Sequence, residues 1–459
     1  MSWSPESWKT KKVAQDVAYD DPLEVAAAVD ALRVLPPLVT SWEIDRLRGF
    51  LGDAQAGTRF LLQGGDCAET MSDCRAEVIV DQLKILLQMS LVLIHGGRKP
   101  IVRIGRFAGQ YAKPRSSPIE TRGDLSLPSY FGDLVNRPAF TAQARRADPR
   151  LMVDAYHHSA LTLNFIRSLS AGGFADLHHP EAWDLAFLRH AALDPDLRAS
   201  YERTCRQLGE ALGFMEALGE VTVDQLTRVD FFTSHEGLNL HYESAQTRHV
   251  PRREGHWDLT AHLPWIGERT RALDGAHVEF FRGIRNPIGV KLGPKVEPAE
   301  VVALLERLNP DDERGRMVLI TRMGASQVEK ALPPMIEAVQ RSGRTALWVS
   351  DPMHGNGITT AGGIKTRSFD DVLGEVERTF DVHAACGTIL GGVHFELTGA
   401  DVTECIGGAS GVREEDLGLN YASACDPRLN YAQAMEMAFR ISRRMAKTRR
   451  NSRPPRAVG

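Results

Sequence analysis

The sequence predicts an α/β protein: a (β/α)8 barrel with an N-terminal extension and extra helices inserted after the second strand. Three observations favour this fold class. Eight short apolar runs, rich in β-branched residues, recur along the chain, each with the length of a buried strand. Loops rich in Gly, Pro and Asp follow them, and then helical patterns, which is the order of a parallel sheet. The alternative is a doubly wound sheet, but no GxGxxG motif follows the first run.

The N-terminal extension is expected to cover residues 1–58. The stretch DPLEVAAAVDALRVL places Asp21 as a cap and Pro22 in the first turn of a helix, and two prolines after it stop that helix. The stretch SWEIDRLRGFL predicts a second, short helix. These helices precede the first predicted strand and therefore lie outside the barrel repeat.

The barrel is expected to span residues 59–447. Its strands are predicted at 59–65, 99–106, 228–235, 260–267, 287–293, 317–324, 345–353 and 391–399. Helices are predicted between most of them, for example at 298–308, 326–343 and 370–385. The long gap between the second and third strands holds further helical patterns, so we expect a helical insert at about 137–227. The basic stretch 448–459 carries no acidic residue and is expected to be a disordered tail.

Composition narrows the class of protein. The chain has 459 residues, 43% hydrophobic and 25% charged, as in a soluble enzyme with a large core. A formal net charge of -4 gives no sign of a nucleic-acid partner. Six cysteines in so long a chain indicate a reducing compartment. The start is polar, and the longest apolar stretch, ILLQMSLVLIHGG, is too short to span a bilayer. We therefore expect a cytoplasmic protein with no membrane contact.

Chemically distinctive residues stand where the predicted strands end, which is where barrel enzymes carry their chemistry. One group combines thiol, imidazole and carboxylate, and such a mixed set suits a divalent first-row metal. Its members are Cys67, His354, Glu396 and Asp426. They are spread over the chain without a local spacing motif. For each residue alone, ordinary packing or hydrogen bonding is therefore the competing interpretation.

A second group is basic. Lys and Arg are poor residues for strand ends unless they meet anions, and Arg binds phosphate or carboxylate bidentately. This pattern predicts substrates that carry several phosphate or carboxylate groups. The residues are Arg106, Lys113, Arg115, Arg269, Lys291 and Arg322. At the end of the third strand, His235 and Glu236 either orient ligands or pack in the core.

Ten motifs in order resemble those of the class II (plant-type) 3-deoxy-D-arabino-heptulosonate 7-phosphate (DAHP) synthases, over nearly the whole chain. They are LLQGGDCAE, RIGRFAGQYAKPRS, WIGERTRALDGAH, GVKLGP, TRMGA, DPMHGN, KTR, HFELTG, VTECIGG and CDPRLN. The resemblance implies a transferase that condenses phosphoenolpyruvate with erythrose 4-phosphate, the first step of the shikimate pathway. It also implies a homodimer or larger homo-oligomer, and a divalent metal, Mn²⁺ first, with Co²⁺ or another first-row metal as alternatives.

The resemblance also implies roles for residues. The metal ligands would be Cys67, His354, Glu396 and Asp426. The phosphoenolpyruvate-binding residues would be Arg106, Glu268, Arg269, Lys291 and Arg322. The KPRS loop, with Lys113, Arg115 and Ser116, would hold erythrose 4-phosphate. Cys67, Glu268, Lys291 and His354 would act in catalysis, and either Glu268 or a metal-bound water would handle protons.

The chain departs from the family pattern at a few loop positions. Phe131, Arg137 and Gly357 replace the expected Arg, Gly and Thr, and GTILGG replaces GTHPGG. These changes leave three hypotheses: an ordinary active synthase, a secondary-metabolism paralogue that supplies a natural-product pathway or uses an altered aldose phosphate (aminoDAHP type), and a non-catalytic metal- and phosphate-binding regulator. Separately, Cys425 precedes Asp426, so we expect that oxidation joins Cys67 to Cys425.

Overall fold

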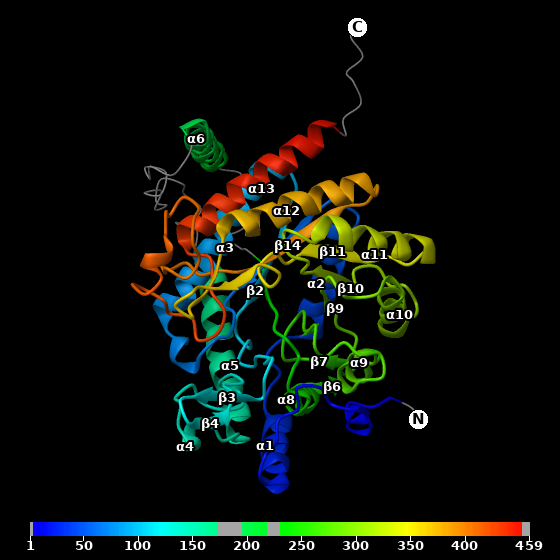
Figure 1. Cartoon of the computed structure of the whole chain (residues 1–459). Helices are drawn as coiled ribbons and strands as arrows, with labels where there is room; N and C mark the ends of the chain where they lie inside the picture. The colour runs from blue at the N-terminus through cyan, green and yellow to red at the C-terminus, as the bar shows by residue number, and fades with distance from the viewer. Residues whose placement is uncertain (1–2, 172–194, 218–229, 452–459) are drawn as a thin grey trace.

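The computed structural model describes residues 3–171, 195–217 and 230–451. All eight predicted strands are present, and they form one parallel sheet (Figure 1). The strand order is β5-β2-β1-β14-β11-β10-β9-β8. In chain order the strands are β1 (Phe60–Gly65), β2 (Ile101–Arg106), β5 (Phe231–Thr233), β8 (Trp265–Ile266), β9 (Ile288–Leu292), β10 (Met317–Thr321), β11 (Leu347–Ser350) and β14 (Leu390–Glu396).

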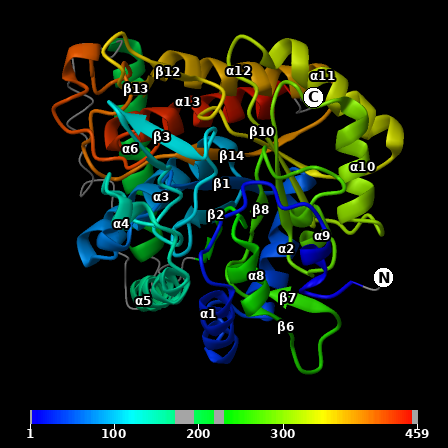
Figure 2. The ribbon, with the colours of Figure 1, turned by 60° about the horizontal axis from the view of Figure 1, so that its bottom comes forward.

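The sheet curls so that its two edge strands meet (Figure 2). Beyond β5, the backbone N–H of Gly237 donates to the carbonyl of Trp265 in β8 at 3.0 Å, and the Trp265 N–H donates to His235 at 3.0 Å. The architecture is therefore an α/β fold like a TIM barrel. β8 is much shorter than the predicted strand 260–267, because Pro264 has no N–H to donate to a sheet ladder.

Helices cover the outer face of the sheet between successive strands (Figure 1). The three helices predicted in the second half of the chain are present as α10 (Pro298–Leu308), α11 (Val328–Ser342) and α12 (Phe369–Ala385). The last helix, α13 (Tyr431–Asn451), packs along α3 (Ala76–Gly97). α13 therefore includes the first residues of the predicted tail, and residues 452–459 lie outside the described residues.

The N-terminal extension contains both predicted helices, α1 (Pro22–Val34) and α2 (Ser41–Gln55). The Asp21 carboxylate caps α1 by accepting the N–H of Leu23, and Thr40 with Glu43 forms a capping box at the start of α2. α1 packs against α8 (Leu240–Gln246) and α5 (Arg150–Ala171), whereas α2 packs against strands of the sheet.

The predicted insert lies partly within the described residues. These contain α4 (Ala142–Arg145), α5 and α6 (Pro195–Ala217), but residues 172–194 and 218–229 are not described. Three two-stranded hairpins were not predicted: β3 (Ile119–Arg122) with β4 (Leu125–Pro128), β6 (Thr247–His249) with β7 (His256–Asp258), and β12 (Gly357–Thr359) with β13 (Lys365–Arg367). Their strands are only three or four residues long, so they lack a clear period-two pattern.

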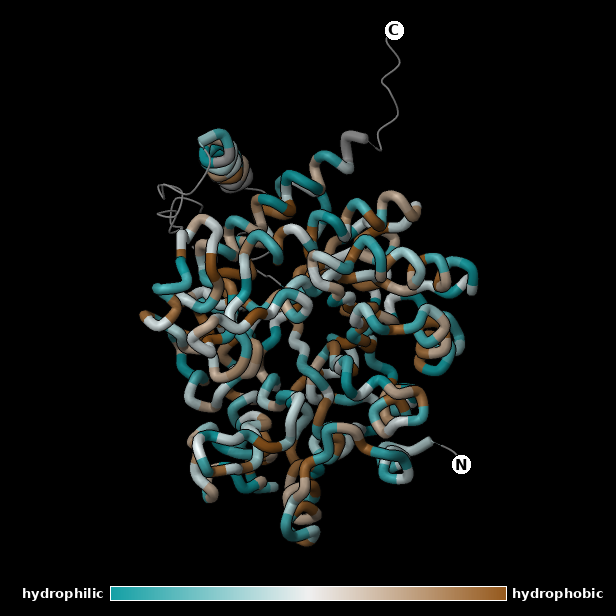
Figure 3. Tube along the Cα trace, in the orientation of Figure 1, coloured by the Kyte–Doolittle hydropathy of each residue, from teal (hydrophilic) through white to brown (hydrophobic). Residues whose placement is uncertain are grey.

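An apolar core fills the inside of the curled sheet. Inward side chains such as Leu61, Ile104 and Ile320 join Leu47 and Leu51 of α2 in one buried cluster. In Figure 3, which colours the trace by hydropathy, many stretches at the periphery of the molecule are hydrophilic. The interior is thus a packed core rather than a channel, which leaves the strand ends as the place for a site.

The length and apolar composition of α3 bear on the prediction that the protein has no membrane contact. α3 has 22 residues and is long and apolar enough to cross a membrane by length and composition, so the argument from a short apolar run was wrong on length. However, 67% of its most apolar window is buried, and it packs against β2, α5, α6 and α13. This is the pattern of a core helix in a soluble protein.

Candidate active site

A cavity of about 240 Å³ opens at the carboxyl ends of the strands, where loops from several strands converge. It brings together most of the site residues that the sequence predicts. Its lining comprises Lys113, Pro114, Arg115, Ser116, Glu236, Gly267, Glu268, Arg269, Lys291, Arg322, His354, Gly357, Lys365, Arg367 and Asp426. The other predicted residues, Cys67, Arg106 and Glu396, are buried and contact Lys113 or one another.

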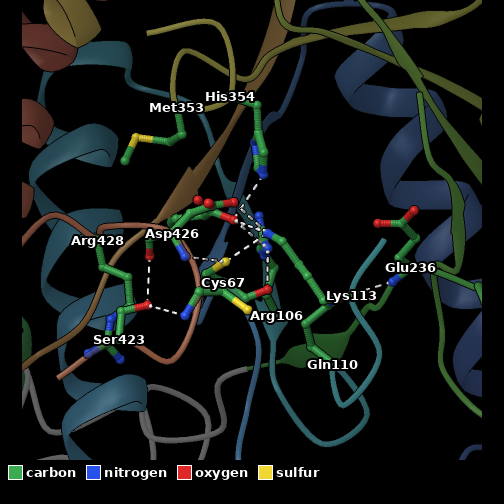
Figure 4. A network of polar contacts seen from close by, with 12 residues as sticks. Cys67, Arg106, Gln110, Lys113, Glu236, Met353, His354, Ser423, Asp426 and Arg428 are labelled. Carbon is green, nitrogen blue, oxygen red and sulfur yellow. Dashed lines mark hydrogen bonds and ion pairs between the residues drawn. The ribbon is translucent and has the colours of Figure 1, made fainter. Parts of the chain in front are cut away.

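The four predicted metal ligands lie together, although they come from distant parts of the chain. Figure 4 shows three of them, Cys67, His354 and Asp426. One ligand atom each of Cys67, Glu396 and Asp426 lies within 4.8 Å of the other two. His354 Nε2 is 2.9 Å from Glu396 Oε1. Cys67 follows β1 and Glu396 ends β14, and these strands pair in parallel, so the sheet itself sets part of this arrangement.

The ammonium of Lys113 lies among these donors. Its Nζ is 2.7 Å from Cys67 Sγ, 2.9 Å from Asp426 Oδ2 and 3.5 Å from Glu396 Oε1. A positive charge therefore already contacts three of the four predicted ligands. Together with the sulfur, nitrogen and oxygen donor set, this shows that the residues fit a divalent first-row cation.

The charge states of Glu396 and Asp426 suit the binding of a cation. Glu396 is fully buried, and burial alone would raise its pKa. His354, Lys113, Arg367 and Arg106 outweigh that effect and hold the pKa of Glu396 well below its usual range. Lys113 likewise lowers the pKa of Asp426. Both groups are ionised at neutral pH, as carboxylate metal ligands must be.

His354 is oriented by a carboxylate that the sequence analysis did not assign. Asp351 Oδ2 lies 2.8 Å from His354 Nδ1 and 2.7 Å from Lys291 Nζ. His354 and Lys291 hold the pKa of Asp351 well below its usual value, against the effect of burial. Nδ1–H can therefore donate to Asp351, which fixes the ring so that Nε2 points at Glu396 Oε1. The motif DPMHGN contains Asp351, but only the fold shows its partners.

Glu236, for which the sequence left two interpretations, lines the cavity. Its residue is 8% exposed, and its Oε1 has no hydrogen-bond partner among the described residues. The backbone N–H of Glu236 donates a hydrogen bond to Gln110 Oε1 at 2.9 Å. Burial raises the pKa of Glu236, although Lys291 and Lys113 oppose this. Gly267 leaves room for this position of the carboxylate, because a Cβ there would lie 1.9 Å from Oε1 and the Glu236 side chain would have to shift.

The second carboxylate of the cavity, Glu268, is less enclosed. It lies directly after Gly267, and its Oε1 accepts a hydrogen bond from Arg271 at 3.3 Å. Its other oxygen, Oε2, has no partner among the residues that the structure describes. Two carboxylates of different burial thus face one cavity, so both are candidates for proton transfer.

The predicted arginines occupy different depths. Arg106 is buried, donates to Glu396 at 3.1 Å and lies 5.3 Å from the ring centre of Trp265. Arg322 lines the cavity and donates to the carbonyl of His354. Arg269 is exposed and also lines the cavity. Arg106 is therefore committed to the buried donor set, while the other two remain at the cavity surface.

Two cations of the β12–β13 hairpin were not assigned from the sequence. Arg367 is buried and donates to Glu396 Oε2 at 2.8 Å, and Lys365 lies 3.3 Å from Asp426 Oδ1. They belong to the KTR motif, which was the available signal. Of the loop departures, Gly357 lines this cavity, whereas Arg137 lines a separate cavity and pairs with Asp133 at 3.7 Å.

The curled parallel sheet and the cationic cavity at its carboxyl ends define an α/β enzyme of small, multiply charged anions. Comparison with known proteins makes this specific. A profile of the class-II DAHP synthetase family matches residues 3–442, so the chain belongs to that family. The predicted family and the predicted enzyme class, a transferase, are confirmed.

Three curated relatives align with nearly the full length of the chain. A phospho-2-dehydro-3-deoxyheptonate aldolase of Neurospora crassa is 47% identical over 96% of this chain and 94% of its own length. A protein of the same name from Streptomyces coelicolor is 46% identical over 95% and 96%. The phospho-2-dehydro-3-deoxyheptonate aldolase AroG of Mycolicibacterium smegmatis is 44% identical over 95% and 93%.

The site also bears on the predicted oxidation of Cys67. Cys67 and Cys425 share a small buried cluster with Tyr130, and both are free thiols. Arg115 Nη1 lies 3.7 Å from Cys425 Sγ, and Lys113 Nζ lies 2.7 Å from Cys67 Sγ, so cations flank both sulfurs. Disulfide formation would remove one proton and one electron from each thiol and reduce peroxide to water.

We expect hydrogen peroxide to inactivate the parent protein several times faster than Cys425→Ser, because the variant cannot form this disulfide. Residual phosphate release and free thiols are measured together over time. Cys386→Ser, at the end of α12, serves as the control and should be inactivated like the parent. Equal inactivation rates for the parent and Cys425→Ser would contradict the prediction.

Proposed function

We propose that this cavity is the active site in which the chain acts as a DAHP synthase, the enzyme of the first step of the shikimate pathway. Phosphoenolpyruvate and erythrose 4-phosphate would react there to give DAHP and phosphate. The observation that carries the proposal is the convergence of seven cavity-lining cations on a buried donor set of sulfur, nitrogen and oxygen. These cations are Lys113, Arg115, Arg269, Lys291, Arg322, Lys365 and Arg367.

Phosphoenolpyruvate would occupy the side of the cavity formed by the loops after β8, β9 and β10. Lys291, Arg269 and Arg322 line that side and can neutralise its phosphate and carboxylate. Lys291 is held by Asp351 at 2.7 Å, so its ammonium has a fixed position. Fixing the enol phosphate in one orientation would supply a large part of the rate enhancement.

Erythrose 4-phosphate would bind against the KPRS loop, residues 113–116. Arg115 and Ser116 line the cavity from this loop, and Arg115 can bind a phosphate bidentately. The C3 atom of phosphoenolpyruvate then attacks the aldehyde carbon and forms the new C–C bond. Lys113, which lies among the donor set, would stabilise negative charge that develops nearby.

Water would next add to C2 of the former enol phosphate, and phosphate would leave with cleavage of its C–O bond. Glu236 is placed to take the proton from this water, because the residue lines the cavity and its buried Oε1 has no partner among the described residues. Glu268 is the alternative base. In either case the carboxylate must be ionised when water attacks.

Cys67, His354, Glu396 and Asp426 would hold the divalent metal, with Mn²⁺ as the first candidate and Co²⁺ as the next. When bound, such a metal acts as a Lewis acid toward a carbonyl oxygen. Lys113 would have to yield its present contacts with three of these residues, or keep only part of them. Binding would also release the proton of Cys67, whose pKa is raised by burial.

A second candidate function is a paralogue that takes a different aldose phosphate. Gly357 lines the cavity, and a Cβ built there would meet no atom within 4 Å. The threonine of the family pattern would therefore fit, and glycine leaves additional space in the cavity. This observation favours an altered acceptor, whereas the intact donor set and cations argue against a non-catalytic regulator.

The direct test is phosphate release by purified protein with Mn²⁺, phosphoenolpyruvate and erythrose 4-phosphate. We expect turnover that is lost after chelation and restored by single metals added back, which ranks the metals. Arg322→Gln should lose most of the turnover, while Arg341→Gln, an exposed arginine of α11, should keep it. Release with another aldose phosphate but not with erythrose 4-phosphate would favour the paralogue, and no release with any would reject both.

The proposal also covers the closure of the barrel and the assembly of the enzyme. The sheet is taken to be a closed (β/α)8 barrel over residues 59–447, supported by the hydrogen bonds between Trp265 and the chain after β5. The extension 1–58 and the insert at about 137–227 would be additions to it. The enzyme would work in the cytoplasm as a homodimer or larger homo-oligomer, and mass measurement in solution tests the assembly.

A further inference from the structure

The N-terminal segment, residues 3–19, is fastened to the barrel at several points. Trp8 is buried at 4% exposure. The carbonyl of Lys12 accepts the N–H of Ala276 at 3.0 Å, and Tyr19 Oη accepts Asn239 Nδ2 at 3.0 Å. Figure 2 shows this segment, in dark blue, crossing from the N-terminus toward α1. The segment is therefore a fixed part of the fold near the carboxyl ends of the strands.

Between Lys12 and Tyr19 the segment makes a turn at Ala14 and Gln15. Gln15 stands at this turn with φ +59°, the left-handed region that side-chain-bearing residues rarely adopt. Its Oε1 accepts the backbone N–H of Arg115 at 2.6 Å, across 100 residues of sequence. A strained residue whose side chain reaches a substrate loop indicates a contact that the fold maintains at a cost.

Two side chains anchor the KPRS loop, since Lys113 contacts Cys67 and Asp426, and Arg115 Nη1 lies 3.7 Å from Cys425 Sγ, but its backbone has few hydrogen bonds. Lys113 N–H donates to Phe131 at 2.9 Å, but Pro114 has no N–H, and the residues from Ser116 to Ile119 are exposed. Arg115 nevertheless has to present its guanidinium to the cavity that it lines. Gln15 thus holds the backbone of the residue whose side chain would meet the acceptor phosphate.

We propose that Gln15 is a positioning residue for the acceptor aldose phosphate. This inference rests on the proposed function of the KPRS loop. Gln15 is not among the residues that line the cavity and acts through the backbone of Arg115, by fixing where that side chain begins. The cations on the phosphoenolpyruvate side do not depend on it, because Lys291 lies in β9 and Arg269 and Arg322 belong to other loops. The expected consequence is a selective effect on the acceptor.

The variant that tests this is Gln15→Gly, because glycine accepts the left-handed backbone and removes only the side chain. We expect the KM for erythrose 4-phosphate to rise about five- to tenfold, the effect of one lost hydrogen bond to a substrate-binding loop. The KM for phosphoenolpyruvate and the unfolding temperature should change little. Gln15→Glu keeps an acceptor oxygen and should restore most of the affinity, while Asp16→Ala, in the same turn, should behave like the parent.

Amide hydrogen exchange tests the contact between Gln15 and the KPRS loop without relying on turnover. Amide hydrogen exchange of the peptide that contains Arg115 should be faster in Gln15→Gly than in the parent and near parental in Gln15→Glu. If the parent lacks activity, the proposed function fails, and the exchange data still decide whether Gln15 fixes the loop. An active parent whose erythrose 4-phosphate KM is unchanged in Gln15→Gly, or a Gln15→Gly variant in which both KM values rise equally, would overturn the inference.

Discussion

Replacing Cys67 with alanine is expected to lower turnover at least about a thousandfold, because a metal at this site would contribute several kcal/mol to the barrier. Cys67 is the only thiol of the proposed ligand set. Its sulfur lies within 4.8 Å of the ligand atoms of Glu396 and Asp426. With this donor gone, we expect the protein purified from Mn²⁺-containing buffer to retain much less metal per chain.

The fold should survive this change. Lys113, which loses its contact with the Cys67 sulfur, keeps Asp426 at 2.9 Å and Glu396 at 3.5 Å, so its charge stays paired. Removing one buried sulfur leaves only a small cavity, for which we expect a stability loss of about 1–2 kcal/mol. The unfolding temperature therefore separates a lost ligand from a lost fold.

Metal content after dialysis, phosphate release and thermal unfolding are measured on the same preparations. Cys386→Ala, a partly exposed cysteine at the end of α12, is the matched control and should retain metal and turnover. A Cys67→Ala protein with parental metal content and turnover would remove Cys67 from the ligand set.

Local patterns in the sequence were sufficient for the strands. Runs such as 59–65 and 287–293 became β1 and β9 because they are buried on both faces, which gives a continuous apolar signal. The predicted strand 260–267 was too long: only Trp265–Ile266 forms β8, because Pro264 has no N–H to continue the ladder. The short hairpins carry too few residues for any periodicity, so their cations on β13 went unassigned.

The ligand set was accessible only through the order of motifs along the chain. Cys67 and Asp426 are far apart in sequence and meet because β1 pairs with β14, after which the chain returns to the same end of the sheet. Contacts between residues far apart in sequence were missed because only the fold brings the partners together. Asp351 gains its role from Lys291 and His354, and Gln15 from a loop 100 residues away.

The carboxylate that receives the proton can be identified by replacing Glu236 with glutamine. We expect kcat to fall about 10²- to 10⁴-fold, the usual contribution of a general base. The glutamine side chain has nearly the same shape, so binding of phosphoenolpyruvate should persist. The unfolding temperature should not fall, because the parent buries a carboxyl oxygen that has no partner among the described residues.

The pH dependence of kcat/KM distinguishes a general base at Glu236 from a residue that has only a structural role. Burial raises the pKa of Glu236, and the cations that face it, Lys291, Lys113, His354 and Arg106, only partly oppose this. The acid limb of kcat/KM should therefore lie above the ordinary pKa of glutamic acid, about 4.3, and disappear in Glu236→Gln. A raised pKa also means that ionisation of Glu236 destabilises the fold as pH rises from its unfolded toward its folded pKa, so Glu236→Gln should be more stable than the parent above that range.

Glu268→Gln is the matched control, since Glu268 lines the same cavity but pairs with Arg271. If Glu236 is the base, Glu268→Gln should retain most of kcat and the acid limb. The opposite pattern, with the limb kept in Glu236→Gln and lost in Glu268→Gln, would assign the base to Glu268. Because both carboxylates line the same cavity, a difference between these variants would arise from the deeper burial of Glu236, which is 8% exposed as a residue, against 23% for the Glu268 side chain, and from the Arg271 partner of Glu268.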